Sequence, residues 1–169
     1  MNLEIDGHEV SFAGRIASHS SEPTIVFIHG AAMDYTVWAM YTRYFMHVRR
    51  SVVALDLPAH GRSDGAPLPS IEMMSAWVSR CLDRLGIERI ALAGHSMGAL
   101  VALELAADNT DRVATLALLG AAVPMAVSEE LLDAARQEDA VALDMMVLWG
   151  HAYCSQLGGN PVAGIPVIH

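Results

Sequence analysis

The sequence predicts an α/β fold in which helices flank a mostly parallel β-sheet. Several short apolar segments lack the polar–apolar alternation of half-exposed strands, and this pattern is typical of strands that are buried on both faces of a parallel sheet. Helical patterns separate these segments, as strand–helix–strand units require. The chain has 169 residues, about the size of one domain, and 53% of them are apolar, which is enough to build a core.

The expected elements follow one another in a regular order along the chain. Two short extended segments come first, at residues 3–5 and 9–12, and the turn pair Asp6-Gly7 separates them. Gly86 and the pair Asp108-Asn109 mark the ends of two helices. The buried strands are expected at residues 24–29, 51–57, 89–93 and 113–119, and the helices between them at residues 36–47, 71–85 and 97–107.

The pattern changes at Pro124. Two helices rich in Met and Leu are expected beyond it, at residues 128–137 and 138–149, before a Gly- and Pro-containing segment at residues 158–166. This tail is more typical of a helical lid than of another strand–helix unit. We therefore expect two parts, an incomplete α/β core over residues 1–123 and the beginning of a helical cap over residues 124–169.

The composition excludes several classes of function. Ten Lys and Arg stand against 19 Asp and Glu, so the chain has a formal charge of −9 and lacks the cationic surplus that binds nucleic acids or anionic membranes. Its apolar stretches are interrupted or too short to span a membrane, and no targeting segment is visible. Cys81 and Cys154 form no disulfide framework. We expect a cytoplasmic protein without nucleic-acid or membrane partners.

The same reading excludes the common cofactor sites. The dinucleotide fingerprint G-x-G-x-x-G follows none of the expected strands, because the glycines at 94 and 98 are spaced G-x-x-x-G. No two of His29, His60 and His95 have a recognised metal-ligand spacing. We therefore expect neither a cofactor nor a metal.

The strongest functional motif is GHSMG at residues 94–98. Ligands of parallel sheets bind beyond the carboxyl ends of the strands, and this motif follows one strand and opens a helix at Met97. That context is required of a nucleophile elbow, whose tight turn predicts a positive φ at Ser96 and leaves no room for side chains at Gly94 and Gly98. The alternative is that Ser96 simply caps the following helix.

Three motifs in this order resemble the α/β-hydrolase fold family, in particular its capped esterase, hydrolase and haloperoxidase-like branch. They are His29-Gly30, the segment DLPAHGRS at residues 56–63, and GHSMG. The resemblance covers about residues 3–119, and the segment from Pro124 is similar to the start of an inserted cap. It implies Ser96 as the nucleophile, the backbone amides of Met97 and Ala31 as an oxyanion hole, and Gly30, Ala32 and His95 as substrate-binding residues.

The resemblance gives structural roles to the remaining motif residues. His29 is expected to hold the oxyanion loop through its ring nitrogens, and Asp56 and His60 to fix the turn after the fourth strand. Ala59 stands where the family usually has glycine. A positive φ at an alanine costs about 1 kcal/mol, so we expect an adjusted turn there.

The acid and the histidine that would complete a catalytic triad are not evident. A serine hydroxyl needs a base and an orienting acid, and in this family both follow the serine along the chain. The sixth strand is followed by GAAVP, without a carboxylate, and the acids of residues 125–169 fall on polar helix faces. His151 and His169 are the alternatives for a base. We expect an amino-terminal portion of a hydrolase that needs a complementary carboxyl-terminal segment or self-associates through its open sheet edge.

Two functions remain open for this chain. The first is a serine hydrolase that acts on a small ester-like or related carbonyl substrate through an acyl-enzyme, with little or no activity in the 169-residue chain alone. The alternative is a non-catalytic α/β-hydrolase-fold protein, or a remnant, that binds a small ligand. The missing triad acid and histidine favour the alternative, and the elbow at Ser96 favours the hydrolase.

Overall fold

The computed structural model describes residues 1–17, 21–137 and 140–150. The chain divides into two compact units, Met1–Ala121 and Ala122–His169. None of the described helices combines the length and the apolarity that a membrane span requires.

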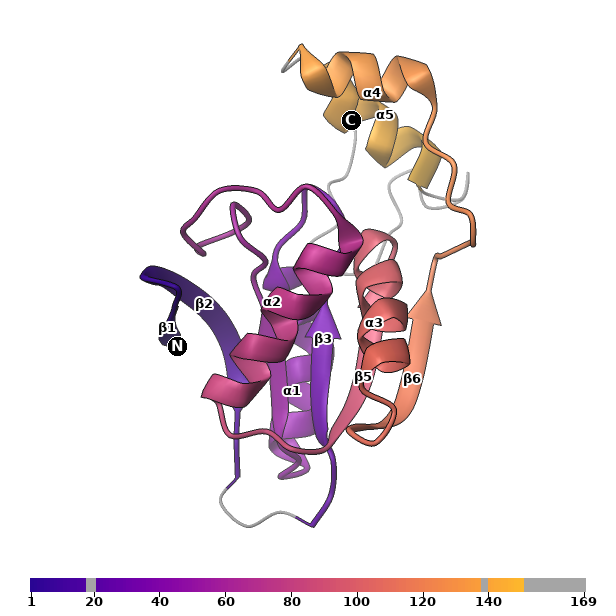
Figure 1. The fold of residues 1–169 in the computed structure, drawn as a ribbon. Helices are drawn as coiled ribbons and strands as arrows, with labels where there is room; N and C mark the ends of the chain where they lie inside the picture. The colour runs from indigo at the N-terminus through magenta and orange to yellow at the C-terminus, as the bar shows by residue number, and fades with distance from the viewer. Residues whose placement is uncertain (18–20, 138–139, 151–169) are drawn as a thin grey trace. The chain divides into compact units, whose positions relative to one another are not determined.

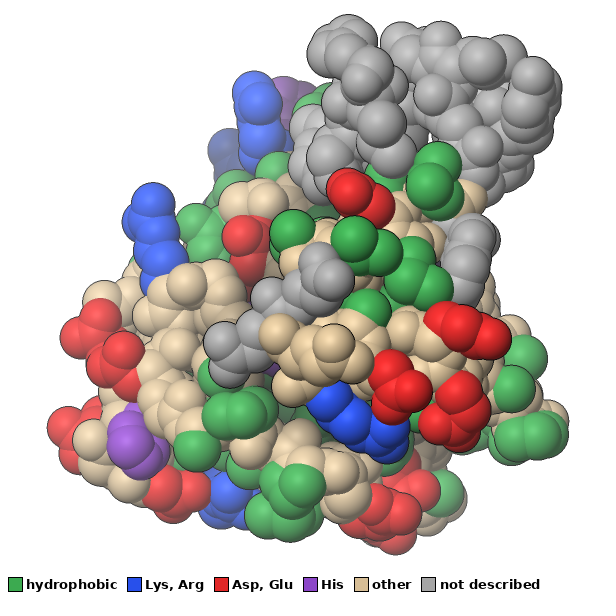
Figure 2. Space-filling model, turned by 90° about the horizontal axis from the view of Figure 1, so that it is seen from above, with side chains coloured by type: hydrophobic (Ala, Val, Ile, Leu, Met, Phe, Trp, Pro, Cys, Tyr) green, Lys and Arg blue, Asp and Glu red, His purple; other side chains and the backbone are tan. Residues whose placement is uncertain are grey.

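Hydrophobic side chains are exposed among acidic ones on the face seen in Figure 2.

Unit 1 is built on a six-stranded sheet with the strand order β1-β2-β4-β3-β5-β6. The central strands β4, β3, β5 and β6 run parallel to one another, whereas β1 and β2 are antiparallel to their neighbours. The predicted α/β class with a mostly parallel sheet is therefore confirmed. The strands are β1 (Asn2–Ile5), β2 (His8–Arg15), β3 (Thr24–Ile28), β4 (Val52–Leu55), β5 (Ile90–His95) and β6 (Val113–Leu119).

Helices cover both faces of this sheet (Figure 1). On one face, α2 (Ile71–Arg84) and α3 (Met97–Asp108) enclose the larger apolar core. On the other face, the 3₁₀-helix η1 (Tyr35–Trp38) continues into α1 (Ala39–His47) and covers a smaller core in which Trp38 stacks on Phe27. Helix α2 begins where the Ser70 side chain accepts a hydrogen bond from the Met73 amide, and a positive φ at Gly86 follows its end.

Several element boundaries differ from the sequence-based expectation, and three of them have a clear physical reason. The segment expected as one helix at residues 36–47 begins with η1, because Asp34 caps it by accepting from the Thr36 amide. Strand β2 continues to Arg15 because the chain pairs with β4 as far as Val52. Strand β5 continues to His95 because it stays paired with β6 as far as Leu119. Pairing partners far along the chain decide strand ends, and local sequence does not reveal them.

Strand β6 is at one edge of the described sheet. It carries no charged residue, and Leu118 and Leu119 are about 40% exposed, at 43% and 39%. Charged residues and prolines are the usual protection of an edge strand against pairing with another chain. This edge has neither within Val113–Leu119.

The described part of unit 2 contains two helices, α4 (Glu129–Arg136) and α5 (Val141–Gly150). Ser128 caps α4 by accepting from the Leu131 amide at 3.2 Å. Both helices were expected, although α5 begins at Val141, later than the expected residue 138. The expected segment 158–166, the alternative bases His151 and His169, and Cys154 lie outside the described residues.

Candidate active site

Ser96 occupies a strained turn between β5 and α3. Its backbone has φ +53° and ψ −120°, a region that residues with a Cβ rarely adopt. Although Ser96 is at the N-cap position of α3, its side chain makes no capping hydrogen bond. The predicted positive φ is present, and the interpretation of Ser96 as a simple helix cap is wrong. The hydroxyl of this half-buried residue is therefore not used to stabilise the helix.

Two glycines make this turn possible because they let the backbones approach closely. A Cβ on Gly94 would lie 2.5 Å from the carbonyl carbon of Gly98, and a Cβ on Gly98 would lie 2.5 Å from the carbonyl oxygen of Ile28. Real Cβ atoms do not approach backbone atoms this closely. The start of α3 is thus pressed against the end of β3, and this contact fixes the position of Ser96 between the two elements.

Gly30 brings the loop after β3 beside Ser96. A Cβ on Gly30 would lie 3.3 Å from the Cβ of Ser96 and 3.2 Å from Nδ1 of His95. The loop then turns back, since the Met33 amide donates to the Gly30 carbonyl at 3.3 Å and Ala32 has φ +55°. Ala31 is half-buried and Ala32 is exposed. The structure therefore brings the loop of residues 30–33 and the elbow together.

His95 links this loop to the end of β6. Its ring lies beside Gly30, and its Nε2 would be 3.4 Å from a Cβ on Gly120. Gly120 has φ +59°, and the Ser96 amide donates to the Leu119 carbonyl at 2.9 Å. No role of Gly120 was expected from the sequence, although a glycine directly after an apolar strand is a recognisable signal for such a turn.

His29 joins the loops that follow β3 and β4. The Leu57 amide donates to His29 Nε2 at 3.1 Å, and His29 Nδ1 lies 2.8 Å from the Gly30 carbonyl oxygen. An amide nitrogen only donates, so Nε2 is the acceptor and Nδ1 carries the proton that is donated to Gly30. The side chain is fully buried, and this burial holds the pKa of His29 below its usual value. A smaller contribution from His60 lowers this pKa further, while the Gly30 hydrogen bond and the Asp56 and Asp34 carboxylates oppose the shift.

The neutral state of His29 predicts a loss of stability in acid. Because the pKa of His29 is lower in the folded than in the unfolded chain, the unfolded chain binds the extra proton first as the pH falls below about 6.5. The free energy of unfolding then decreases, by up to about 1.4 kcal/mol per pH unit, until the pH passes the folded-state pKa. Urea unfolding at pH 7.5 and 5.5 measures the effect. His29→Asn should remove this pH dependence of the free energy of unfolding, and His60→Asn is the control. If His29→Asn kept the pH dependence of the wild type, His29 would not be its source.

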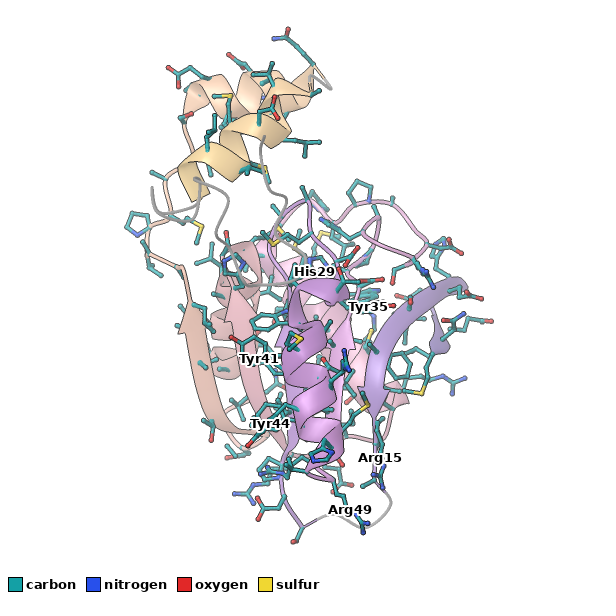
Figure 3. All side chains as sticks on the ribbon, turned by 180° about the vertical axis from the view of Figure 1, so that it is seen from behind. Arg15, His29, Tyr35, Tyr41, Tyr44 and Arg49 are labelled. Carbon is teal, nitrogen blue, oxygen red and sulfur yellow. The ribbon has the colours of Figure 1, made fainter. Side chains whose placement is uncertain are left out.

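Asp56 organises the loop after β4 through backbone amides. Its Oδ1 accepts from the Tyr35 amide at 2.7 Å and its Oδ2 from the Arg62 amide at 3.0 Å. The Asp56 carbonyl also accepts from the Ser63 hydroxyl at 2.7 Å. The Asp56 side chain is fully buried, although the amides of Tyr35 and Arg62 that it binds lie only partly buried. Figure 3 shows His29 and Tyr35 at one end of unit 1 and Arg15 and Arg49 at the other.

His60 also holds this turn, as expected, because its Nδ1 bonds the Pro58 carbonyl at 2.9 Å. Ala59 differs from expectation. The turn is not adjusted for alanine, since Ala59 itself takes φ +61°. A glycine two positions later, Gly61, is required because its Cβ would lie 2.5 Å from Asp56 Cγ. The backbone of this loop therefore keeps a positive φ at position 59, and Ala59 bears the cost of that conformation.

The described residues hold no group of three or more His, Cys, Asp or Glu side chains that could bind a metal ion. Cys81 is a free thiol packed in the core, and burial raises its pKa to about 12. The chemistry-bearing group that the fold presents at the elbow is thus the Ser96 hydroxyl.

Comparison with known proteins identifies the family. A family model described as the alpha/beta hydrolase fold matches residues 23–151. The chain therefore belongs to the α/β-hydrolase fold family, which confirms the resemblance of its three motifs. Its relatives include esterase, hydrolase and haloperoxidase-like proteins.

Two curated relatives illustrate the range of the family. The chain is 36% identical over 117 residues to the dihydrolipoyllysine-residue acetyltransferase component of the acetoin cleaving system of Cupriavidus necator, covering 69% of this chain and 30% of that protein. It is 41% identical over 100 residues to a putative non-heme haloperoxidase from a Mycobacterium phage, covering 58% of this chain and 36% of that protein. The chain thus spans about a third of these relatives' own lengths.

Solved structures agree with this assignment. The enol-lactonase from Burkholderia xenovorans superposes with a TM-score of 0.75 at 28% identity, covering 88% of this chain and 58% of that one. A thermophilic esterase superposes with a TM-score of 0.71 at 27% identity, covering 88% of this chain and 54% of that one. The fold described here therefore corresponds to somewhat more than half of each of those chains.

Proposed function

We propose that this chain carries the nucleophile of a serine hydrolase that acts on a small ester-like or related carbonyl substrate through an acyl-enzyme. The observation that carries the proposal is Ser96 itself: φ +53° at a strand-to-helix turn, with a hydroxyl that does not cap the helix. Backbone strain of this kind persists only where the surrounding structure enforces it, and it gathers at functional sites.

The proposed oxyanion hole consists of the backbone amides of Met97 and Ala31. Met97 is the first residue of α3, so its N–H has no acceptor within the helix and lies at the positive end of the helix dipole. Ala31 follows Gly30, on which an added Cβ would lie only 3.3 Å from the Ser96 Cβ. Two such donors stabilise a tetrahedral oxyanion by about 3 kcal/mol each. Gly30, Ala32 and His95 would then border the bound substrate.

The proposed reaction has two steps, acylation of Ser96 and hydrolysis of the acyl-serine. Ser96 Oγ bonds to the substrate carbonyl carbon while its proton passes to a base, and collapse of the tetrahedral adduct expels the alcohol, which takes that proton. Water then attacks the acyl-serine and releases the acid. The base in this proposal is an imidazole oriented by a carboxylate, both supplied by a complementary carboxyl-terminal segment. The chain alone is accordingly expected to be inactive or weakly active.

Covalent labelling tests this proposal. A fluorophosphonate probe should modify the protein at Ser96, as located by peptide mass spectrometry, because phosphonylation uses the same nucleophile and the same oxyanion donors. The labelling should be slow in this chain alone and faster with an added carboxyl-terminal segment of a relative, because that segment supplies the proposed base. Ser96→Ala should lose the label, whereas Ser70→Ala, which removes only the cap of α2, should keep it. Labelling that persists in Ser96→Ala, or that is found on another residue, would refute the assignment of the nucleophile.

A second candidate is a non-catalytic protein that binds a small ligand in the same place. It is favoured by the segment GAAVP directly after β6, which offers no carboxylate to serve as a triad acid. This candidate predicts that small esters or lactones raise the melting temperature without turnover and without labelling of Ser96. The hydrolase predicts labelling, and an increase in its rate when a carboxyl-terminal segment of a relative is added.

We also propose that the edge strand β6 is a pairing surface, either for that complementary segment or for a second copy of the chain. At micromolar concentration the chain alone is expected to self-associate, because β6 is apolar and uncharged. Leu118→Lys should shift sedimentation toward monomer, since a lysine disfavours pairing at an edge. Leu103→Lys, at an exposed position of α3, is the matched control. A monomeric wild-type chain that melts cooperatively would overturn this part of the proposal.

The proposed location is the cytoplasm and the proposed partner is a small-molecule substrate. The free thiol of Cys81 suits a reducing compartment. Fractionation of the host cell tests the location directly. Recovery of the protein only outside the cytoplasm would contradict it.

A further inference from the structure

Helix α1 carries an exposed apolar stripe on its outer side. Residues three and four positions apart lie on the same face of a helix. The stripe consists of Met40, Tyr41, Tyr44 and Val48. Tyr44 is 61% exposed, and the half-exposed ring of Tyr41 contacts the buried rings of Phe27 and Trp38. The stripe therefore continues the smaller core of unit 1 outward to the surface.

The sheet offers a second apolar surface on the same face. Strand pairing continues the rows of Ile25 and Phe27, which belong to the smaller core, across β5 and β6. We call this continuation the shelf, and it consists of Ala91, Ala93, Thr115 and Ala117. Its β5 residues are half-buried and its β6 residues are exposed. The shelf is uncharged, and its small side chains allow another element to approach closely.

The chain topology explains why α2 and α3 do not cover the shelf. The connection from β3 to β4 through α1 runs in one direction along the sheet, and the connections through α2 and α3 run in the other. Right-handed connections of opposite direction place their helices on opposite faces, as Figure 1 shows. A further strand beyond β6 would place its connecting helix on the face of α3 again. The shelf therefore requires a cover of another kind.

The shelf has room for one helix beside α1. Helix α1 packs over β4 and β2, and β3 separates β4 from the two strands of the shelf. Neighbouring strands lie about 4.8 Å apart, so the middle of the shelf is about 12 Å from β4. Packed helices need about 8–10 Å between their axes. Figure 3 shows Tyr41 and Tyr44 on the side of α1 that is nearer to β5 and β6 in this view.

We propose that two copies of the chain pair face to face, with the α1 stripe of each copy seated on the shelf of the other. Stripe and shelf lie on the same face, so one two-fold axis makes both contacts at once and the assembly closes as a dimer. The two α1 helices then form a layer between the two sheets, which is a stable layer arrangement. Tyr and Met are enriched in such interfaces and charged residues are depleted at their cores.

Sedimentation of substituted chains tests this pairing separately from pairing at the β6 edge. Leu118→Lys blocks the edge, so it should move sedimentation toward monomer but stop at a dimer that is held by the α1 face. Adding Tyr44→Lys should raise the dissociation constant of this dimer at least about tenfold, because an ammonium group would lie on an apolar surface. Met73→Lys, at an exposed position of α2, is the matched control and should leave the dimer unchanged.

A substitution in the shelf tests the other half of the same contact. In the Leu118→Lys chain, Ala117→Lys should also weaken the dimer at least about tenfold. Cooperative thermal unfolding checks the fold of each variant, and both substituted positions are exposed. If only one of the two substitutions weakened the dimer, the stripe would not be seated on the shelf.

Two further results would overturn the inference. One is a dimer of the Leu118→Lys chain that persists unchanged with Tyr44→Lys. The other is a monomeric Leu118→Lys chain, including one that binds only an added carboxyl-terminal segment of a relative, since that segment would then be the occupant of the shelf. None of these measurements involves labelling of Ser96, so each outcome leaves the proposed nucleophile untouched.

Discussion

Gly98→Ala is expected to destabilise the protein by about 3 kcal/mol or more, a large share of the 5–15 kcal/mol that stabilises a typical domain. Alanine is the better helix former by about 1 kcal/mol, so helix propensity alone predicts the opposite sign. Packing decides the outcome, because the new Cβ would lie 2.5 Å from the carbonyl oxygen of Ile28, which belongs to the buried strand β3. Relief requires α3 to move away from the sheet, and the elbow moves with it.

Urea unfolding measures this loss, and Gly86→Ala is its control. Gly86 has φ +66°, but a Cβ there would meet nothing within 4 Å. Gly86→Ala should therefore cost only about 1 kcal/mol of backbone strain. If Gly98→Ala destabilised the protein no more than Gly86→Ala, the close contact between α3 and β3 would not be a feature of the native state.

Asp56→Asn is expected to destabilise the protein by about 3 kcal/mol, although the two side chains have nearly the same shape. Both carboxylate oxygens of this fully buried side chain accept from backbone amides, those of Tyr35 and Arg62. An asparagine keeps one acceptor and turns an NH₂ group toward the other N–H, so one of the two amides loses its partner and faces a second donor. The bond to Tyr35 also ties η1 to this loop, so the chain that follows the proposed oxyanion loop should loosen.

Asp34→Asn is the matched substitution. Asp34 is only half-buried and caps η1 with a single oxygen, which asparagine retains. Its effect on the free energy of unfolding should stay below about 0.5 kcal/mol. Equal effects of the two variants would show that the Asp56 bonds contribute no more than an ordinary surface cap.

The order of the elements could be predicted from local sequence because each strand and helix carries its own signal. The β-branched segments and the stop at Gly86 are local, and β6 was found at Val113–Leu119 as expected. The extension of β2 to Arg15 could not be predicted, because it depends on pairing with β4 about 40 residues later. The order of the strands in the sheet is likewise a property of long-range contacts.

The elbow was predictable for the same reason, because Gly94, Ser96 and Gly98 lie within five consecutive residues and their spacing is typical of this turn. The bonds of Asp56 to the Tyr35 amide and of His29 to the Leu57 amide were not, because backbone donors carry no residue-type signal. The turn at Gly120 had a local signal, a glycine directly after an apolar strand, but its place beside His95 depends on the pairing of β5 with β6. The roles of Ser96, Met97 and Ala31 remain proposals that the labelling experiments test.

The positive φ of Ser96 sets the proposed catalytic role of this residue against the stability of the fold. A serine in this conformation costs about 1–3 kcal/mol, and glycine would adopt it without that cost. Laboratory evolution for heat resistance alone should therefore enrich glycine at position 96. Such variants would melt at a higher temperature but would lack the hydroxyl of the proposed nucleophile. Any thermostabilisation of this fold accordingly needs a second, simultaneous screen for covalent reactivity.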